Sequence, residues 1–129
     1  MFEICGLEKT SLTLKEAEQV ITIARAVAEE NGYQVPEYIL VLFVEDKEYN
    51  KMLKNSKHMV EIDDGVLVDD GHRVVIKGSF LPIKLLEKIF LGLMTAFHYN
   101  TFLAYDTSFA RNFLREKFLY FLSLIYGRK

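Results

Sequence analysis

The seven-residue run YILVLFV, residues 38–44, constrains the fold more than any other stretch of this sequence. Apolar residues occupy both the odd and the even positions, so both faces of a strand built from it would be apolar. The run is shorter than a typical helix, and it is rich in β-branched and aromatic residues, which favours a buried strand. We therefore expect a central strand here.

The segment before this run predicts an amphipathic helix between Thr10 and Asn31. Thr13 and Glu16 have the spacing of a capping box, and Gly32 is a typical C-terminal stop. Apolar residues recur at the i, i+3, i+4, i+7 spacing of one helical face. They are Leu14, Ala17, Val20, Ile21, Ala24, Val27 and Ala28.

After the central run, residues 47–55 predict a short helix, and residues 58–79 predict short strands joined by tight turns. Two Asp-Asp-Gly triplets, 63–65 and 69–71, separate the β-prone runs. Asp and Gly tolerate the positive φ values that tight hairpin turns require. We interpret the triplets as turns.

Two helices follow. The first starts at Pro82 and runs to about Leu103, with a narrow polar stripe on an otherwise apolar surface. The stripe consists of Lys84, Lys88, Thr95 and His98. The last helix follows the cap residues YDTS and ends at Gly127. Its predicted core face consists of Ala110, Phe113, Leu114, Phe118, Phe121, Leu122 and Ile125.

These elements predict one α+β domain over residues 1–129. We expect an N-terminal helix, a small and mostly antiparallel sheet of three or four strands, and two C-terminal helices packed on one face. The length of 129 residues suits a single core.

Composition and charge narrow the classes of function. Half of the residues are apolar and 17 are Phe or Tyr, as in a folded globular protein. Residues 1–80 carry a net charge of −6 and residues 81–129 a net charge of +4. This surplus is small for a nucleic-acid binder, so contact through Arg111, Arg115, Lys117, Arg128 and Lys129 is a weaker hypothesis. No secretory leader or membrane-spanning segment is predicted, so we expect a cytoplasmic protein.

Candidate metal and catalytic groups are sparse. Glu61, Asp63, Asp64, Asp69 and Asp70 gather beside His72, but they lack the alternating ligands and distal glutamate of a calcium loop. The histidines, His58, His72 and His98, lie on different predicted elements and form no ligand pair. Cys5 has no cysteine partner and lies near a terminus that we expect to be mobile. We expect no metal and no cofactor.

The order of helix, strand, hairpin-like strands, core helix and last helix resembles small zincin-type metallopeptidase domains over roughly residues 13–125. In that family a strand precedes a helix with a His-Glu-x-x-His motif, whose histidines bind zinc and whose glutamate activates water. The segment MTAFH matches only at His98, with Met94 at the first ligand and Thr95 at the glutamate. Asp106 is the candidate third ligand. The resemblance implies a non-catalytic descendant that kept the scaffold.

The sequence thus predicts a non-catalytic binding or regulatory protein that acts through a protein partner or forms a homodimer. The last helix supports this prediction, because several apolar residues lie partly or wholly outside its core face. They are Phe109, Leu119, Tyr120, Leu124 and Tyr126. The candidate interaction or degenerate-site positions are Thr95, His98, Leu119, Tyr120 and Leu124. The alternative is a small metal-dependent hydrolase with histidine and aspartate ligands.

Overall fold

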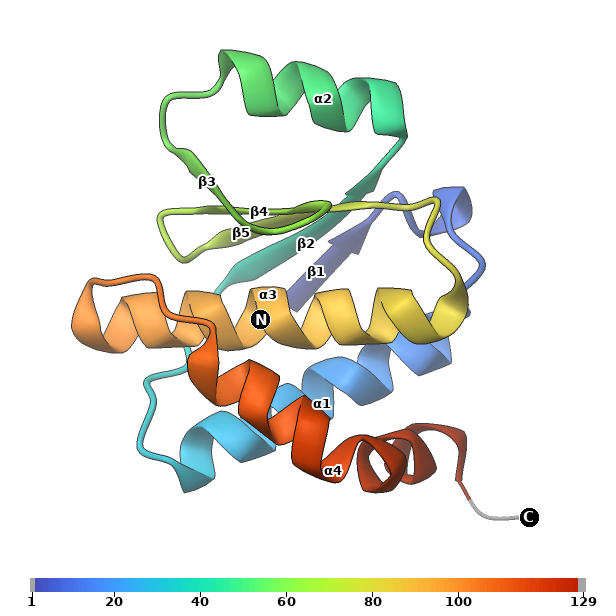
Figure 1. The fold of residues 1–129 in the computed structure, drawn as a ribbon, viewed down its shortest axis with the longest axis vertical. Helices are drawn as coiled ribbons and strands as arrows, with labels where there is room; N and C mark the ends of the chain where they lie inside the picture. The colour runs from blue at the N-terminus through green and yellow to red at the C-terminus, as the bar shows by residue number, and fades with distance from the viewer. Residues whose placement is uncertain (1, 128–129) are drawn as a thin grey trace.

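The computed structural model describes residues 2–127, which form an α+β fold with four α-helices and a five-stranded mixed sheet (Figure 1). The strands are Phe2–Cys5 (β1), Ile39–Val44 (β2), Met59–Asp63 (β3), Val66–Asp69 (β4) and Arg73–Lys77 (β5). The helices are Leu14–Glu30 (α1), Asp46–Asn55 (α2), Pro82–Phe102 (α3) and Ser108–Tyr126 (α4), with a 3-10 turn at Leu7–Lys9 (η1).

The strand order is β1-β2-β5-β4-β3. β1 pairs parallel with β2, and β2 pairs parallel with β5, whereas β4 pairs antiparallel with β5 and with β3. The expectation of a mostly antiparallel sheet of three or four strands is therefore wrong. The hairpin turns are visible in the sequence. The two parallel pairings leave no local signal, because α1 lies between β1 and β2, and α2, β3 and β4 lie between β2 and β5.

The first element is a strand and not a helix, which also corrects the expected element order. β1 holds Cys5 in register with Leu42 of β2, so the segment near the terminus is part of the sheet. Only four residues, FEIC, form this strand. A run so short carries too little periodicity to be recognised from sequence alone.

The prediction of a strand with two buried faces is confirmed for β2. Val41 and Phe43 belong to the main core, whereas Val44 belongs to a second, smaller cluster with Tyr49 of α2. Figure 1 shows the reason: α2 covers one face of the sheet, and α1 and α3 cover the other.

α3 is the central helix of the main core. It packs on β4 and β5, and α4 packs in turn on α1 and α3, farther from the sheet on the same side (Figure 1). Gly92 permits the close approach to the sheet, because a Cβ atom there would lie 2.5 Å from Cγ1 of Val74. Lys88 and Thr95 are buried. The predicted polar stripe of α3 is therefore only partly exposed: Lys84 faces solvent, whereas α4 and the sheet cover the helix at Lys88 and Thr95.

Local signals in the sequence set several boundaries correctly. Thr13 and Glu16 form the predicted capping box at the start of α1. Both Asp-Asp-Gly triplets form hairpin turns, in which Gly65 has a φ of +79° and Asp70 a φ of +49°. α4 ends at Gly127 as predicted, but its helical geometry is interrupted at Lys117, which has a φ of −128°.

Candidate functional site

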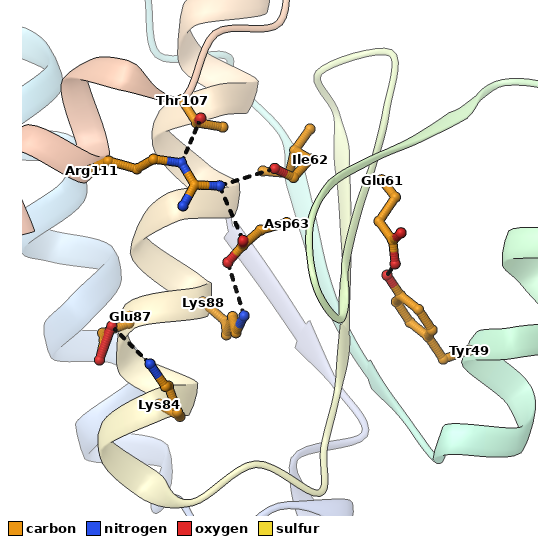
Figure 2. Close-up of polar contacts among 9 residues, drawn as sticks. All are labelled: Tyr49, Glu61, Ile62, Asp63, Lys84, Glu87, Lys88, Thr107 and Arg111. Carbon is orange, nitrogen blue, oxygen red and sulfur yellow. Dashed lines mark hydrogen bonds and ion pairs between the residues drawn. The ribbon is translucent and has the colours of Figure 1, made fainter.

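One carboxylate ties three elements together beside α3. Asp63, the last residue of β3, accepts a hydrogen bond at 2.9 Å from Nζ of Lys88 in α3. Its other oxygen accepts a hydrogen bond at 3.0 Å from Nη2 of Arg111 in α4. Figure 2 shows the carboxylate between the two cations. Asp63 lies next to a β-bulge in the pairing of β3 with β4, and a bulge can redirect a side chain in this way.

The surroundings hold both cations in place. Lys88 is only 7% exposed, and its ammonium lies 4.9 Å from the centre of the Phe80 ring. Arg111 also donates from Nε to Oγ1 of Thr107 and from Nη2 to the carbonyl of Ile62. A buried cation is tolerated when it is paired and hydrogen-bonded, which is the role that Asp63 performs for Lys88.

Asp63 stays ionised in this setting. Burial by itself raises the pKa of the carboxyl group, but the hydrogen bonds and positive charges of Lys88 and Arg111 outweigh burial. The pKa of Asp63 therefore lies below its ordinary value of 3.8.

An open cleft of about 580 Å³ lies beside this network, between α3 and α4. Its lining contains four cations, two carboxylates and three apolar side chains. They are Lys84, Lys88, Arg111 and Arg115; Asp63 and Glu87; and Leu91, Leu114 and Phe118. We call it the α3–α4 cleft. Its volume falls in the range of about 300–1,000 Å³ that is usual for small-molecule sites.

A second surface lies on the C-terminal part of α4. Leu119 is 81% exposed, Tyr120 61% and Leu124 44%. We call these three residues the α4 apolar surface. The hollow along Arg115–Tyr120 shares Arg115 and Phe118 with the α3–α4 cleft, so the cleft and the start of this surface are continuous. The α4 apolar surface includes three of the positions that the sequence singled out.

The two other candidate positions, Thr95 and His98, lie in the C-terminal half of α3. Thr95 is fully buried, and its hydroxyl donates to the carbonyl of Leu91. Met94, at the position of the first zincin ligand, is 2% exposed. Neither Thr95 nor Met94 faces solvent, so no cleft opens at these two residues.

His98 is partly buried among aromatic rings, and the structure brings it close to Asp106. Its Nε2 lies 4.0 Å from Oδ2 of Asp106, and its Nδ1 lies 2.8 Å from the carbonyl oxygen of Ala104. Asp106 also accepts hydrogen bonds from the backbone and hydroxyl of Ser108, the first residue of α4. The hydrogen bonds from Ser108 are the main reason why the pKa of Asp106 lies below its ordinary value, and His98 adds to the effect.

The remaining candidates are dispersed. His58 and His72 are exposed and lie in loops before β3 and β5. Glu61 accepts a hydrogen bond at 2.6 Å from the Tyr49 hydroxyl, and Figure 2 shows this pair apart from Asp63 and its two cations. Burial and this bond raise the pKa of Tyr49. Within residues 2–127, no group of three or more His, Cys, Asp or Glu side chains is arranged to hold a metal ion.

Sequence reasoning missed the Asp63 network. Asp63 was interpreted only as a turn residue, and its partners Lys88 and Arg111 lie 25 and 48 positions further along the chain. One signal was available: Lys88 is followed directly by the apolar run IFLGLM, residues 89–94, and a lysine in such a helix needs a counter-charge once that helix is central to the core.

Comparisons with known proteins give no relative. No protein-family model matches the sequence, and no curated protein or solved structure matches the chain. In the part of the chain that the structure describes, no helix combines the length and the hydropathy needed to cross a bilayer.

Proposed function

We propose that the protein is a non-catalytic binding or regulatory protein whose protein partner docks on the α4 apolar surface. The observation that carries this proposal is the exposure of Leu119, Tyr120 and Leu124 on one helix. Leu119 and Tyr120 line one hollow of α4; neighbouring exposed apolar side chains of this kind commonly mark interaction sites, and tyrosine is enriched at the centre of interfaces.

The position of the surface supports the proposal. α4 packs on α1 and α3, and its buried residues are Ala110, Leu114, Phe121 and Ile125, so these four make its core contacts. The exposed side chains are not needed for that packing. A partner that covers them would bury a leucine pair and an aromatic ring, and would leave the tyrosine hydroxyl able to form a hydrogen bond.

The test compares three forms of the full chain. Tyr120→Glu combined with Leu124→Glu places two charges on the surface, and Ala26→Glu combined with Asn50→Glu adds the same charge at exposed positions of α1 and α2. Light scattering at micromolar concentration tests for a homodimer, and affinity capture from the native host tests for another partner.

We expect the wild-type and control proteins to share one partner, which is a second copy or another polypeptide, and the α4 variant to lose it. If the wild-type protein is a monomer and captures nothing that the α4 variant fails to capture, the proposal is wrong.

We also propose that the scaffold of the protein is a decayed zincin-like domain. A strand, β5, precedes the helix that carries His98, as the resemblance requires, and Asp106 lies beside that histidine. The alternative function, a small metal-dependent hydrolase, is favoured by the same His98–Asp106 contact. Elemental analysis decides between the two: we expect no stoichiometric zinc, iron or manganese. One metal per chain that is lost on His98→Ala would instead support the hydrolase.

A further inference from the structure

The α3–α4 cleft carries more positive charge than its own carboxylates balance. Asp63 serves both Lys88 and Arg111, so this trio keeps one positive charge. Lys84 lies 3.7 Å from Glu87, and the two charges cancel. Among residues 2–127 the side chain of Arg115 has one hydrogen-bond partner, the neutral Asn112. The cleft therefore holds an excess of two positive charges.

One donor group of the cleft, the guanidinium of Arg111, is oriented before any ligand arrives. Asp63, Thr107 and the carbonyl of Ile62 hold the guanidinium of Arg111, and Figure 2 shows this group on the same side of α3 as Lys88 and Lys84. Donors that are already oriented lose little entropy on binding, and a guanidinium matches the oxygens of a phosphate or carboxylate.

The remaining lining is apolar. Leu91 and Leu114 are buried core residues that border the cleft, and Phe118 is partly buried at the side where the cleft continues along α4. A ligand with a charged group at the cations therefore has an apolar wall available for its body.

We propose that the α3–α4 cleft binds a small, soluble phosphate monoester with an apolar body. A phosphate monoester carries a charge of about −1.5 to −2 at neutral pH, which matches the excess of the cleft. Asp63 and Glu87 limit that excess to two positive charges, which is too few to balance a polyphosphate or a nucleic-acid backbone. This binding does not require a partner on the α4 apolar surface, so either proposal can fail alone.

The experiment titrates phenyl phosphate into the ¹⁵N-labelled full chain and follows amide shifts, with benzoate and benzyl alcohol as comparison ligands. The test variant combines Lys84→Gln with Arg115→Gln, two exposed side chains whose loss spares the buried network. The control variant combines Lys15→Gln with Lys54→Gln, which removes the same charge from exposed positions outside the cleft. Melting temperatures establish that both variants are folded.

We expect saturable shifts around Arg111 and Arg115 with phenyl phosphate, weaker binding of benzoate and none of benzyl alcohol. Because hydrogen bonds to charged groups are strong, affinity should fall about tenfold or more in the test variant and stay unchanged in the control. Absence of saturation, equal affinity for benzoate, or equal loss in both variants would overturn the proposal. Sedimentation with vesicles that contain phosphatidic acid, without saturable binding of phenyl phosphate, would overturn it in favour of a lipid surface.

Discussion

The two halves of α4 contrast sharply. In the first half, Arg111 is tied to β3 through Asp63, and the helix is anchored by polar contacts as well as by its core face. Beyond the irregular residue Lys117, Leu119, Tyr120 and Leu124 are exposed, while Phe121 and Ile125 keep this half packed on the core. The contrast teaches that one helix can serve two purposes: its first half fixes the architecture, and its second half presents a surface that the fold itself does not use.

Neighbouring aromatic residues in the second half give the largest expected difference. Phe121 is fully buried and Tyr120 is exposed. Phe121→Ala should lower the free energy of unfolding by about 4 kcal/mol, because it leaves a cavity in the core. Tyr120→Ala should change it by about 0.5 kcal/mol or less, as is usual for surface substitutions. Urea denaturation measures both values, and similar losses would show that Tyr120 is needed for folding.

A second comparison tests the anchor in the first half. Asp63→Asn keeps the shape of the side chain and removes the charge that balances Lys88 and Arg111. We therefore expect the free energy of unfolding to fall by about 2–3 kcal/mol. Asp64→Asn, one position later and exposed, is the matched control and should change stability by less than about 0.5 kcal/mol. This result would revise the expectation from sequence that both triplets serve only as turns. Equal stability of the two variants would mean that the anchor contributes nothing.

The pH dependence of the unfolding free energy gives a further test of the Asp63 anchor. The pKa of Asp63 is lower in the folded protein than its ordinary value of 3.8. Its stabilising contribution is therefore fully present above the ordinary value and is lost as the pH falls through the lower, folded-state value. The difference in unfolding free energy between wild type and Asp63→Asn should be constant near neutral pH and shrink in acid. A difference that grows as the pH falls below 4 would contradict the assignment.

Local signals in the sequence predicted much of this fold, and long-range pairings limited the rest. The capping box of Thr13 and Glu16 and the Asp-Gly turns each depend on residues a few positions apart, and they lie where the sequence placed them. The short strand β1 and the parallel pairing of β2 with β5 depend on segments far apart in the chain.

The same difference between local and long-range signals applies to the candidate sites. The sequence identified Leu119, Tyr120 and Leu124 because helical periodicity shows which residues fall outside a core face. The α3–α4 cleft went unrecognised, since its charges come from β3, α3 and α4 and only the folded chain brings them together. The burial of Thr95 was also missed, because periodicity cannot reveal that a second layer of helix covers α3.

Photo-crosslinking can show directly whether a partner covers the α4 apolar surface. A benzophenone amino acid replaces Leu119 in the full chain, and in a control it replaces Ala26 on the exposed face of α1. The account predicts that irradiation in the native host joins position 119 to a protein of defined mass, either a second copy or another polypeptide. It also predicts that Tyr120→Glu with Leu124→Glu abolishes the adduct and that position 26 gives none. Equal labelling at positions 119 and 26, or no adduct at position 119, would contradict the account.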